Sequence, residues 1–195
     1  VLFRSNVIAV EIDNKLPAVL AKTLEGYDNV RIVHDDILKV NIRELVEDKP
    51  FKVVANLPYY ITTPIIMGIL EQKLPVTRLV TMIQKEVADR MIAKPGKKDY
   101  GSLSVAVQYY TEPEIVALVP PKSFIPSPAV DSVVISCKVR PQPAVKVNSE
   151  KMFFTIAKGG FAQRRKTLSN SLKTTGIPAD RIKGALESAD RKSVV

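Results

Sequence analysis

The chain has 195 residues, of which 46% are hydrophobic and 25% charged, a balance typical of globular proteins and not of disordered or fibrous ones. No apolar run reaches the length of a membrane-spanning helix, and the first residues do not resemble a signal peptide. The net charge of +9 is concentrated after residue 139, where 12 basic residues accompany 4 acidic ones, which favours a polyanionic partner for this part. One cysteine (Cys137) and one histidine are too few for a zinc site, and a lone cysteine fits a reducing compartment. We therefore expect a cytoplasmic protein without a metal and without membrane contact.

Strands and helices alternate over the first ninety residues. Short apolar runs predict buried strands at 7–10, 30–33, 52–55 and 79–83. A helix is predicted after each of these strands. The first begins at a cap at Asp13 or Asn14 and ends at Gly26, and the second covers 42–47. The third begins at a cap at Thr63 with Pro64 in its first turn, and the fourth covers 86–92. The alternation predicts an α/β fold with a parallel, doubly wound, Rossmann-like sheet.

The pattern changes after Pro95 and Gly96. Residues 103–110 suit a helix better than a strand, and two strand-like runs follow at 114–119 and 132–139, joined by a proline-rich segment. Such a pair predicts two antiparallel strands added to the sheet edge. After a linker at 140–144, helices are expected at 149–158, 165–174 and 178–189. We thus expect a Rossmann-like domain over 1–140 and a small, basic, all-helical domain over 145–195.

Polar side chains follow three successive predicted strands: Glu11, Asp36 and Asn56. Ligands of open α/β sheets bind at the carboxyl ends of the strands, where an acidic residue can accept hydrogen bonds from ribose hydroxyls. Asp35 competes with Asp36 for this role, and His34 is more simply a strand-end residue. The three together predict a nucleoside-binding edge.

The run Asn56-Leu57-Pro58-Tyr59 is the most informative stretch. Pro58 has no N–H and ends the strand, which leaves an amide, backbone carbonyls and an aromatic ring at its end. The Asn56 side chain and the carbonyl of Leu57 or Pro58 can hold an exocyclic amine so that its lone pair faces a methyl donor. Tyr59 can stack on the base that carries this amine. A strand-ending turn without such chemistry is the competing interpretation.

The motif resembles that of adenine-N6 methyltransferases that act on RNA, and the whole chain resembles the KsgA-type rRNA adenine dimethyltransferases. The matching stretches beyond Asn56 are Met82-Ile-Gln-Lys-Glu-Val-Ala88, Lys98-Asp-Tyr-Gly-Ser-Leu-Ser-Val105, Phe124-Ile-Pro-Ser-Pro-Ala-Val-Asp-Ser132 and Phe161-Ala-Gln-Arg-Arg-Lys-Thr-Leu-Ser-Asn170. The resemblance runs in order from about residue 6 to residue 189.

The resemblance implies an S-adenosylmethionine-dependent enzyme that dimethylates two adjacent adenines in the 3′-terminal hairpin loop of small-subunit (16S) rRNA during ribosome biogenesis. Its partner would be the pre-30S subunit, and we expect a monomer. The cofactor would be bound by Glu11, Ile12, Asp36, Ile37 and Asn56. The target adenine would be held by Asn56, Leu57 and Pro58 and stacked between Tyr59 and Phe124. Contacts to rRNA would come from Lys85, Arg164, Arg165 and Lys166.

The family opens with a further strand and a glycine-rich turn, acidic-x-Gly-x-Gly-x-Gly, which is not found before residue 7 of this sequence. Residues 1–5 and 190–195 also do not resemble the family. We expect a gene product that is incomplete at both ends, and without the turn this chain is expected to lack much of the cofactor site. Two alternatives remain: a large-subunit rRNA methyltransferase of the macrolide-resistance type, and a non-catalytic rRNA-binding assembly factor.

Overall fold

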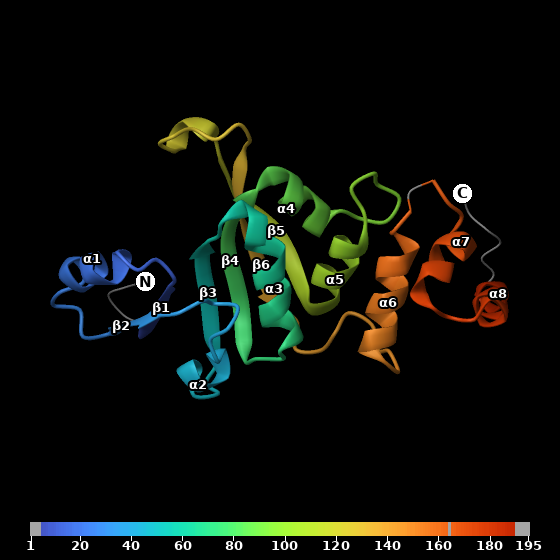
Figure 1. Ribbon diagram of the computed structural model, residues 1–195, viewed down its shortest axis with the longest axis horizontal. Helices are drawn as coiled ribbons and strands as arrows, with labels where there is room; N and C mark the ends of the chain where they lie inside the picture. The colour runs from blue at the N-terminus through green and yellow to red at the C-terminus, as the bar shows by residue number, and fades with distance from the viewer. Residues whose placement is uncertain (1–4, 164, 190–195) are drawn as a thin grey trace. The chain divides into compact units, whose positions relative to one another are not determined.

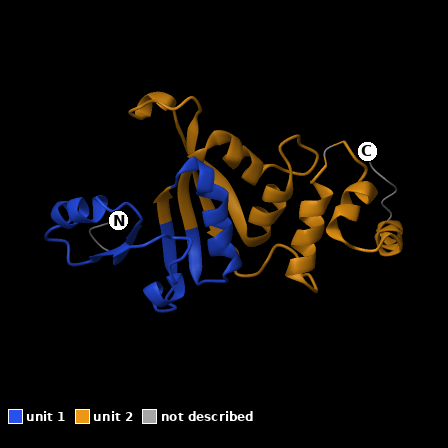
Figure 2. Cartoon of the chain, in the orientation of Figure 1, with its two compact units in different colours: residues 1–53, 57–78 blue, residues 54–56, 79–195 orange. Residues whose placement is uncertain are grey.

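The computed structural model describes residues 5–163 and 165–189 of the chain (Figure 1). The chain divides into two compact units, which Figure 2 distinguishes by colour. Unit 1 comprises residues 1–53 and 57–78, and unit 2 comprises residues 54–56 and 79–195. The division runs through the third and fourth strands.

Unit 1 begins with a parallel βαβ arrangement, as the alternation of strand and helix predicts. Strand β1 (Val7–Glu11) pairs in parallel with β2 (Val30–His34), from Val7 opposite Val30 to Glu11 opposite His34. Helix α1 (Leu16–Thr23) connects them. The expected cap at Asp13 or Asn14 is wrong, because the helix is preceded by Lys15, whose N–H donates to the Asp13 carboxylate at 2.7 Å. Asp13 therefore forms a turn ahead of the helix and delays its start.

The rest of unit 1 contains α2 (Ile42–Val46), the first part of β3 (Phe51–Asn56), the short 3₁₀ helix η1 (Tyr59–Ile61), α3 (Thr62–Glu71) and the start of β4 (Val76–Gln84). Helix α3 starts one residue before the predicted cap at Thr63, since the hydroxyl of Thr62 donates to the carbonyl of Pro58 at 3.1 Å. Its predicted apolar face is confirmed, with four members buried: Ile65, Ile66, Ile69 and Leu70.

Unit 2 contains α4 (Lys85–Ile92), α5 (Ser102–Tyr110), β5 (Thr111–Val119), the 3₁₀ helix η2 (Pro121–Ser123) and β6 (Ser132–Val139). The predicted antiparallel pair is confirmed: β5 pairs with β6, and a four-stranded sheet has the order β3-β4-β6-β5. Because β5 is the edge strand, it accommodates Pro113 and so begins at Thr111, three residues earlier than predicted. A β-bulge lies between Ile115 and Ala117.

The mixed α/β class is as predicted, but the strands are divided between two sheets: β1 and β2 form a two-stranded sheet of their own. Periodicity predicts which residues form strands, whereas it does not determine which strands share hydrogen bonds.

The last part of unit 2 is helical, with α6 (Glu150–Gly160), α7 (Leu168–Leu172), the 3₁₀ helix η3 (Lys173–Thr175) and α8 (Ala179–Ser188). The predicted start at residue 165 is wrong, because the side chain of Thr167 accepts from the N–H of Asn170 and caps α7 there. Tyr109 packs against Phe153 and Phe154 of α6, with ring centroids 4.9 and 5.2 Å apart. Among the described residues no helix is long and apolar enough to cross a membrane.

Candidate functional site

The carboxyl ends of β1 and β2 bring Glu11 and Asp36 to the same edge of unit 1. Glu11 is the last residue of β1, and its carbonyl accepts from the N–H of Asp35 at 3.0 Å. The Asp35 carboxylate accepts from the N–H of Asp36 at 2.7 Å and so turns the chain locally. Asp35 is exposed and Asp36 is half-buried, and both lie directly after the end of β2.

The two carboxylates keep acceptor capacity. Glu11 Oε1 accepts from the N–H of Asp13 at 2.8 Å, while Asp36 accepts from the N–H of Leu38 at 3.0 Å and lies 3.7 Å from Lys39 Nζ. Each carboxylate has about four acceptor sites, so further hydrogen bonds to a hydroxyl or an amino group remain available at both. The neighbouring Ile12 and Leu38 are 63% and 50% exposed, which gives this edge apolar surface beside its acceptors.

Asn56 is the last residue of β3, and its side chain is exposed. Its place at a strand end is as predicted. Its side-chain amide, with one acceptor oxygen and one donor nitrogen, is therefore accessible to a substrate.

The turn after β3 is held by the carbonyl of Pro58. This oxygen accepts from the N–H of Ile61 at 3.2 Å and from the hydroxyl of Thr62 at 3.1 Å. Because a carbonyl has two lone pairs, both acceptor sites of Pro58 are occupied. Leu57 is 9% exposed, and Tyr59 opens η1 with its ring half-buried. Of the two carbonyls that the sequence proposes, that of Pro58 therefore already accepts two hydrogen bonds.

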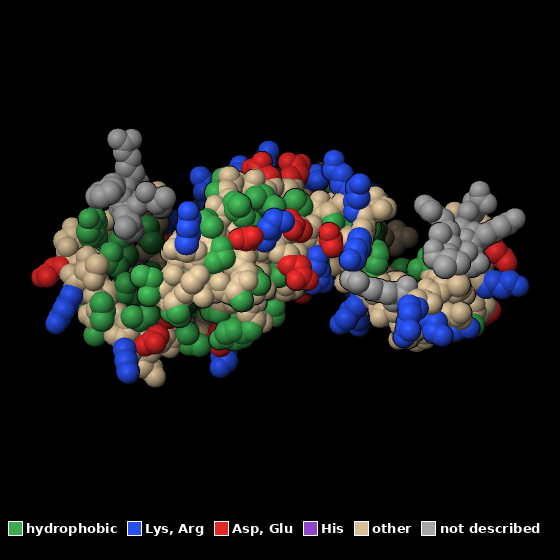
Figure 3. All heavy atoms as spheres, turned by 90° about the horizontal axis from the view of Figure 1, so that it is seen from above, with side chains coloured by type: hydrophobic (Ala, Val, Ile, Leu, Met, Phe, Trp, Pro, Cys, Tyr) green, Lys and Arg blue, Asp and Glu red, His purple; other side chains and the backbone are tan. Residues whose placement is uncertain are grey.

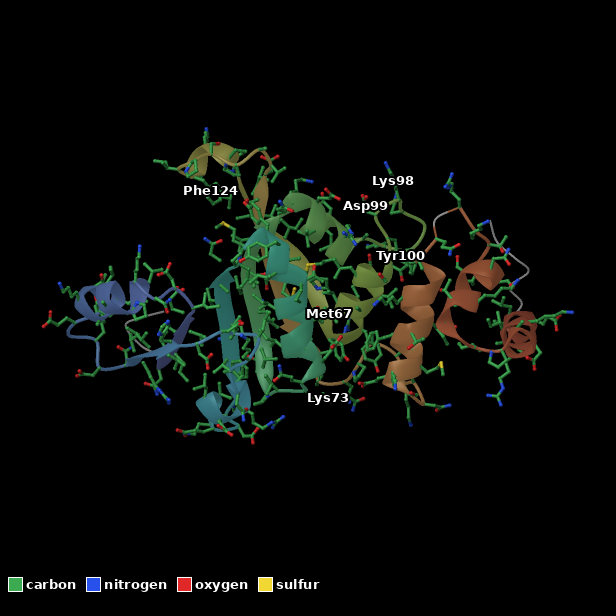
Figure 4. The ribbon with its side chains drawn as sticks, in the orientation of Figure 1. Met67, Lys73, Lys98, Asp99, Tyr100 and Phe124 are labelled. Carbon is green, nitrogen blue, oxygen red and sulfur yellow. The ribbon has the colours of Figure 1, made fainter. Side chains whose placement is uncertain are left out.

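Phe124 lies in unit 2, on the loop between β5 and β6, which projects beyond the helices of that unit (Figures 1 and 4). Its N–H donates to the carbonyl of Pro121 at 3.1 Å, which ends η2. The ring is half-buried, and the next side chain, Ile125, is fully exposed. A proline-rich turn with its own backbone hydrogen bonds holds the aromatic residue in place.

Lys85 is surrounded by acidic groups. Its Nζ lies 2.6 Å from a carboxylate oxygen of Asp89, and its N–H donates to the carbonyl of Asp131 at 2.9 Å. The hydrogen bond and charge of Asp89, with smaller contributions from Asp131 and Asp99, raise the pKa of Lys85. A hollow of about 400 Å³ lies here, lined by Gln84, Lys85, Glu86, Asp89, Asp99, Ala129, Val130 and Asp131.

This hollow brings together residues of three stretches that carry the family resemblance: 82–88, 98–105 and 124–132. The sequence contains one signal for it, the i, i+4 spacing of Lys85 and Asp89 on a helix, which predicts an ion pair. The meeting with Asp131 is not predictable from spacing, because 46 residues separate it from Lys85. The role of Lys85 in RNA contact remains a prediction.

Arg165 and Lys166 are exposed in the turn between α6 and α7, where the N–H of Lys166 donates to the carbonyl of Gln163 at 3.2 Å. Arg164 lies outside the described residues. Figure 3 shows that basic side chains are frequent on the surface of the helical part of unit 2. The described part of the chain contains no group of three or more acidic, histidine or cysteine side chains arranged to hold a metal ion.

Comparisons with known proteins identify the relatives of this chain. The family model described as ribosomal RNA adenine dimethylase matches residues 2–188. The ribosomal RNA small subunit methyltransferase A of Alkaliphilus metalliredigens is 50% identical over 190 residues, covering 94% of this chain and 66% of that protein. The protein of the same name from Clostridioides difficile is 54% identical over 189 residues, covering 94% and 65%.

Two solved structures have the same fold. A dimethyladenosine transferase from Plasmodium falciparum superposes with a TM-score of 0.74 at 26% identity, over 97% of this chain and 68% of that one. The 23S rRNA methyltransferase ErmE superposes with a TM-score of 0.71 at 25% identity, over 97% of this chain and 75% of that one. The chain spans just under two thirds of the length of the curated relatives named above.

Proposed function

The chain belongs to the ribosomal RNA adenine dimethylase family, and on this premise we propose that the protein N6,N6-dimethylates two adjacent adenines of small-subunit rRNA, in its 3′-terminal hairpin loop. The observation that carries the proposal is the family match over residues 2–188, which includes an intact Asn56-Leu57-Pro58-Tyr59 at the end of β3. The small subunit is favoured because the relatives named for it are 50% and 54% identical, against 25% for the large-subunit enzyme ErmE.

The methyl donor that we propose is S-adenosylmethionine, which supplies an electrophilic methyl group when it is bound. The acceptors at the edge of the β1–β2 pair fit its nucleoside. Glu11 would accept from the ribose hydroxyls and Asp36 from the adenine amino group, while Ile12 and Ile37 would lie against the apolar ring faces. Asn56 would approach the cofactor from the end of β3.

The target amine would be held by acceptors. An exocyclic amine is a weak nucleophile because its lone pair is delocalised into the ring. Hydrogen bonds from both amine hydrogens, one to Asn56 Oδ1 and one to the carbonyl of Leu57, would orient the nitrogen and favour a more tetrahedral geometry. The Leu57 carbonyl is preferred to that of Pro58, which already accepts two hydrogen bonds.

The adenine would be stacked by Tyr59 on one face and Phe124 on the other. Stacking on an aromatic side chain contributes about 1–3 kcal/mol per base. Extruding a base from a hairpin loop costs less than extruding it from a duplex, so this substrate suits such a site. The basic residues Arg164, Arg165 and Lys166 would neutralise rRNA phosphates, with Lys85 nearer the loop of Phe124.

The test is a transfer assay with the complete gene product, labelled S-adenosylmethionine and small ribosomal subunits that lack the modification. We expect label on the two adjacent adenines, and loss of it in Asn56→Ala with RNA binding retained. Label on large-subunit rRNA would contradict the proposal in favour of the macrolide-resistance type. Tight subunit binding without any label would favour an assembly factor.

Several expectations stay predictions that this assay does not test: a monomer, a cytoplasmic location, and a division into domains at 1–140 and 145–195. Sedimentation of the protein alone would test the first of them.

A further inference from the structure

The loop between α4 and α5, residues 93–101, presents three lysines to solvent: Lys94, Lys97 and Lys98. Its backbone is ordered by its own hydrogen bonds, from Lys97 N–H to the Lys94 carbonyl at 3.2 Å and from Tyr100 N–H to the Lys97 carbonyl at 3.1 Å. Gly96 supports the turn with a φ of 83°, a left-handed conformation that side chains disfavour. Figure 4 shows Lys98 at the outer side of this loop.

An aromatic contact attaches this loop to the helical part of the same unit. The rings of Tyr100 and Phe161 meet edge to face, with centroids 5.7 Å apart and an interplanar angle of 76°. Phe161 ends α6 and starts the turn that carries Arg165 and Lys166, while Lys158 lies in the last turn of α6. Two basic segments about sixty residues apart in sequence are thus neighbours.

The combined surface is not neutralised within the described residues, 5–163 and 165–189. It comprises six exposed side chains for which these residues provide no ion-pair partner: Lys94, Lys97, Lys98, Lys158, Arg165 and Lys166. Asp99, the acidic residue within the loop, lines the hollow around Lys85. Like charges that are brought together without counter-ions repel, and a bound polyanion would remove that cost.

We propose that the loop 93–101 and the basic residues Lys158, Arg165 and Lys166 form one continuous surface that binds the phosphate backbone of RNA. The inference rests on the proposed rRNA substrate and adds a second anchor to the basic turn. Because lysine is a point charge without fixed hydrogen-bond geometry, the loop would position the RNA rather than read its bases. Its attachment to α6 through Tyr100 and Phe161 would keep the spacing between the two phosphate contacts constant.

The test is the salt dependence of RNA binding by the 195-residue chain, with a hairpin that has two adjacent adenines in its loop, between 50 and 300 mM salt. The slope of log K against log salt is negative, and each lost phosphate contact reduces its magnitude by about 0.7–0.9. We therefore expect Lys97→Ala/Lys98→Ala to reduce the magnitude of this slope by roughly 1.5 and to weaken binding about tenfold or more at 0.1 M salt.

The matched control is Lys15→Ala/Lys22→Ala, which removes the same charge from exposed positions of unit 1 and should leave the slope unchanged. A second control, Lys97→Arg/Lys98→Arg, keeps the charge and should keep the slope. If Lys15→Ala/Lys22→Ala lost as much affinity and slope as the loop variant, net charge alone would explain the effect, and the inference would be overturned.

The remaining outcomes separate this inference from the proposed function. If the unaltered chain binds the hairpin and Lys97→Ala/Lys98→Ala binds it with the same slope, the loop is not an anchor, while the proposed function stands. If the unaltered chain does not bind the hairpin, the inference fails, and the transfer assay on small subunits decides the proposed function separately. Binding of the same variants to phosphatidylserine vesicles is measured in parallel. If Lys97→Ala/Lys98→Ala loses affinity for the vesicles and not for the hairpin, the surface binds lipid and the inference is overturned.

Discussion

Gly159→Ala is the substitution whose effect on stability the structure predicts most sharply. Gly159 is buried near the end of α6, and a Cβ there would lie 2.2 Å from Cγ2 of Thr175 and 3.8 Å from Cδ2 of Leu172. Thr175 cannot easily turn away, because its hydroxyl donates to the Leu172 carbonyl at 2.6 Å and lies 3.4 Å from the N–H of Ile177. The new methyl group would therefore separate α6 from η3.

Two opposing contributions set the magnitude. Replacing a helical glycine by alanine normally raises the free energy of unfolding by about 1 kcal/mol, because alanine loses less backbone entropy. Overpacking a rigid contact costs about 1–3 kcal/mol. We expect the clash to dominate at Gly159, because the contact is as short as 2.2 Å, and to give a net destabilisation of up to roughly 2 kcal/mol.

The control is Gly184→Ala in α8, where an added Cβ meets nothing within 4 Å. Only the entropic contribution applies there, so this variant should be stabilised by up to about 1 kcal/mol. Adding Thr175→Ser to Gly159→Ala removes the clashing methyl group but keeps the hydroxyl and its hydrogen bonds. The double variant should recover most of the lost stability.

The assay is urea denaturation followed by far-UV circular dichroism, with hydrogen exchange of the α6 and η3 amides as the local measurement. Faster exchange in α6 and η3 should accompany Gly159→Ala and disappear in the double variant. The reasoning would be refuted if Gly159→Ala and Gly184→Ala shifted the midpoint in the same direction, or if Thr175→Ser gave no recovery.

Three further predictions concern single side chains. Asn56→Ala should lower methyl transfer by about a hundredfold in the labelled-cofactor assay, as loss of a preorganised polar contact does, and near-normal turnover would contradict its role. Burial raises the pKa of the Cys137 thiol to about 11. An aromatic disulfide reagent should therefore label Cys137 very slowly at pH 8 and about tenfold faster per pH unit above that. Fast labelling at pH 8 would mean that β6 opens and exposes the thiol. Because the folded pKa of Cys137 is the higher one, its contribution to stability is present below the unfolded pKa and is lost as pH rises towards 11, which Cys137→Val would show by a flatter alkaline denaturation profile. Asp89→Asn should return the pKa of Lys85 towards its usual value, measured by NMR of Nζ, and should tighten RNA binding severalfold at low salt; an unchanged pKa would mean that the ion pair does not form in solution.

The sequence predicted the positions of the strands and helices along the chain well. The strand at 7–10, the strand at 30–33 and their parallel relation follow from apolar runs separated by a helical pattern, and the structure confirms them. The errors lie at helix ends, where neighbouring residues compete to form the cap. Asp13, Thr63 and Thr167 are all reasonable caps by type, and only the turn geometry decides that Thr167 caps a helix while Asp13 forms a turn before one.

Non-local relations could not be predicted in the same way. The sequence does not show that β1 and β2 form a separate sheet, or that Phe161 contacts Tyr100, because neither follows from the spacing of residues along the chain. At the candidate site, the sequence offered the carbonyls of Leu57 and Pro58 as equals. The structure adds that the Pro58 carbonyl already accepts two hydrogen bonds, which depends on where Ile61 and Thr62 lie.

The placement of charge within unit 2 suggests why the loop 93–101 has its particular order of residues. Lys98 and Asp99 are consecutive, yet Asp99 lines the hollow around Lys85 and Lys98 belongs to the basic surface proposed to bind RNA. Asp89, Asp99 and Asp131 raise the pKa of Lys85 and weaken its attraction for a phosphate. An RNA backbone would therefore be held more strongly on the Lys98 side of the loop than on the Asp99 side, so that one loop both attracts the strand and limits where it lies.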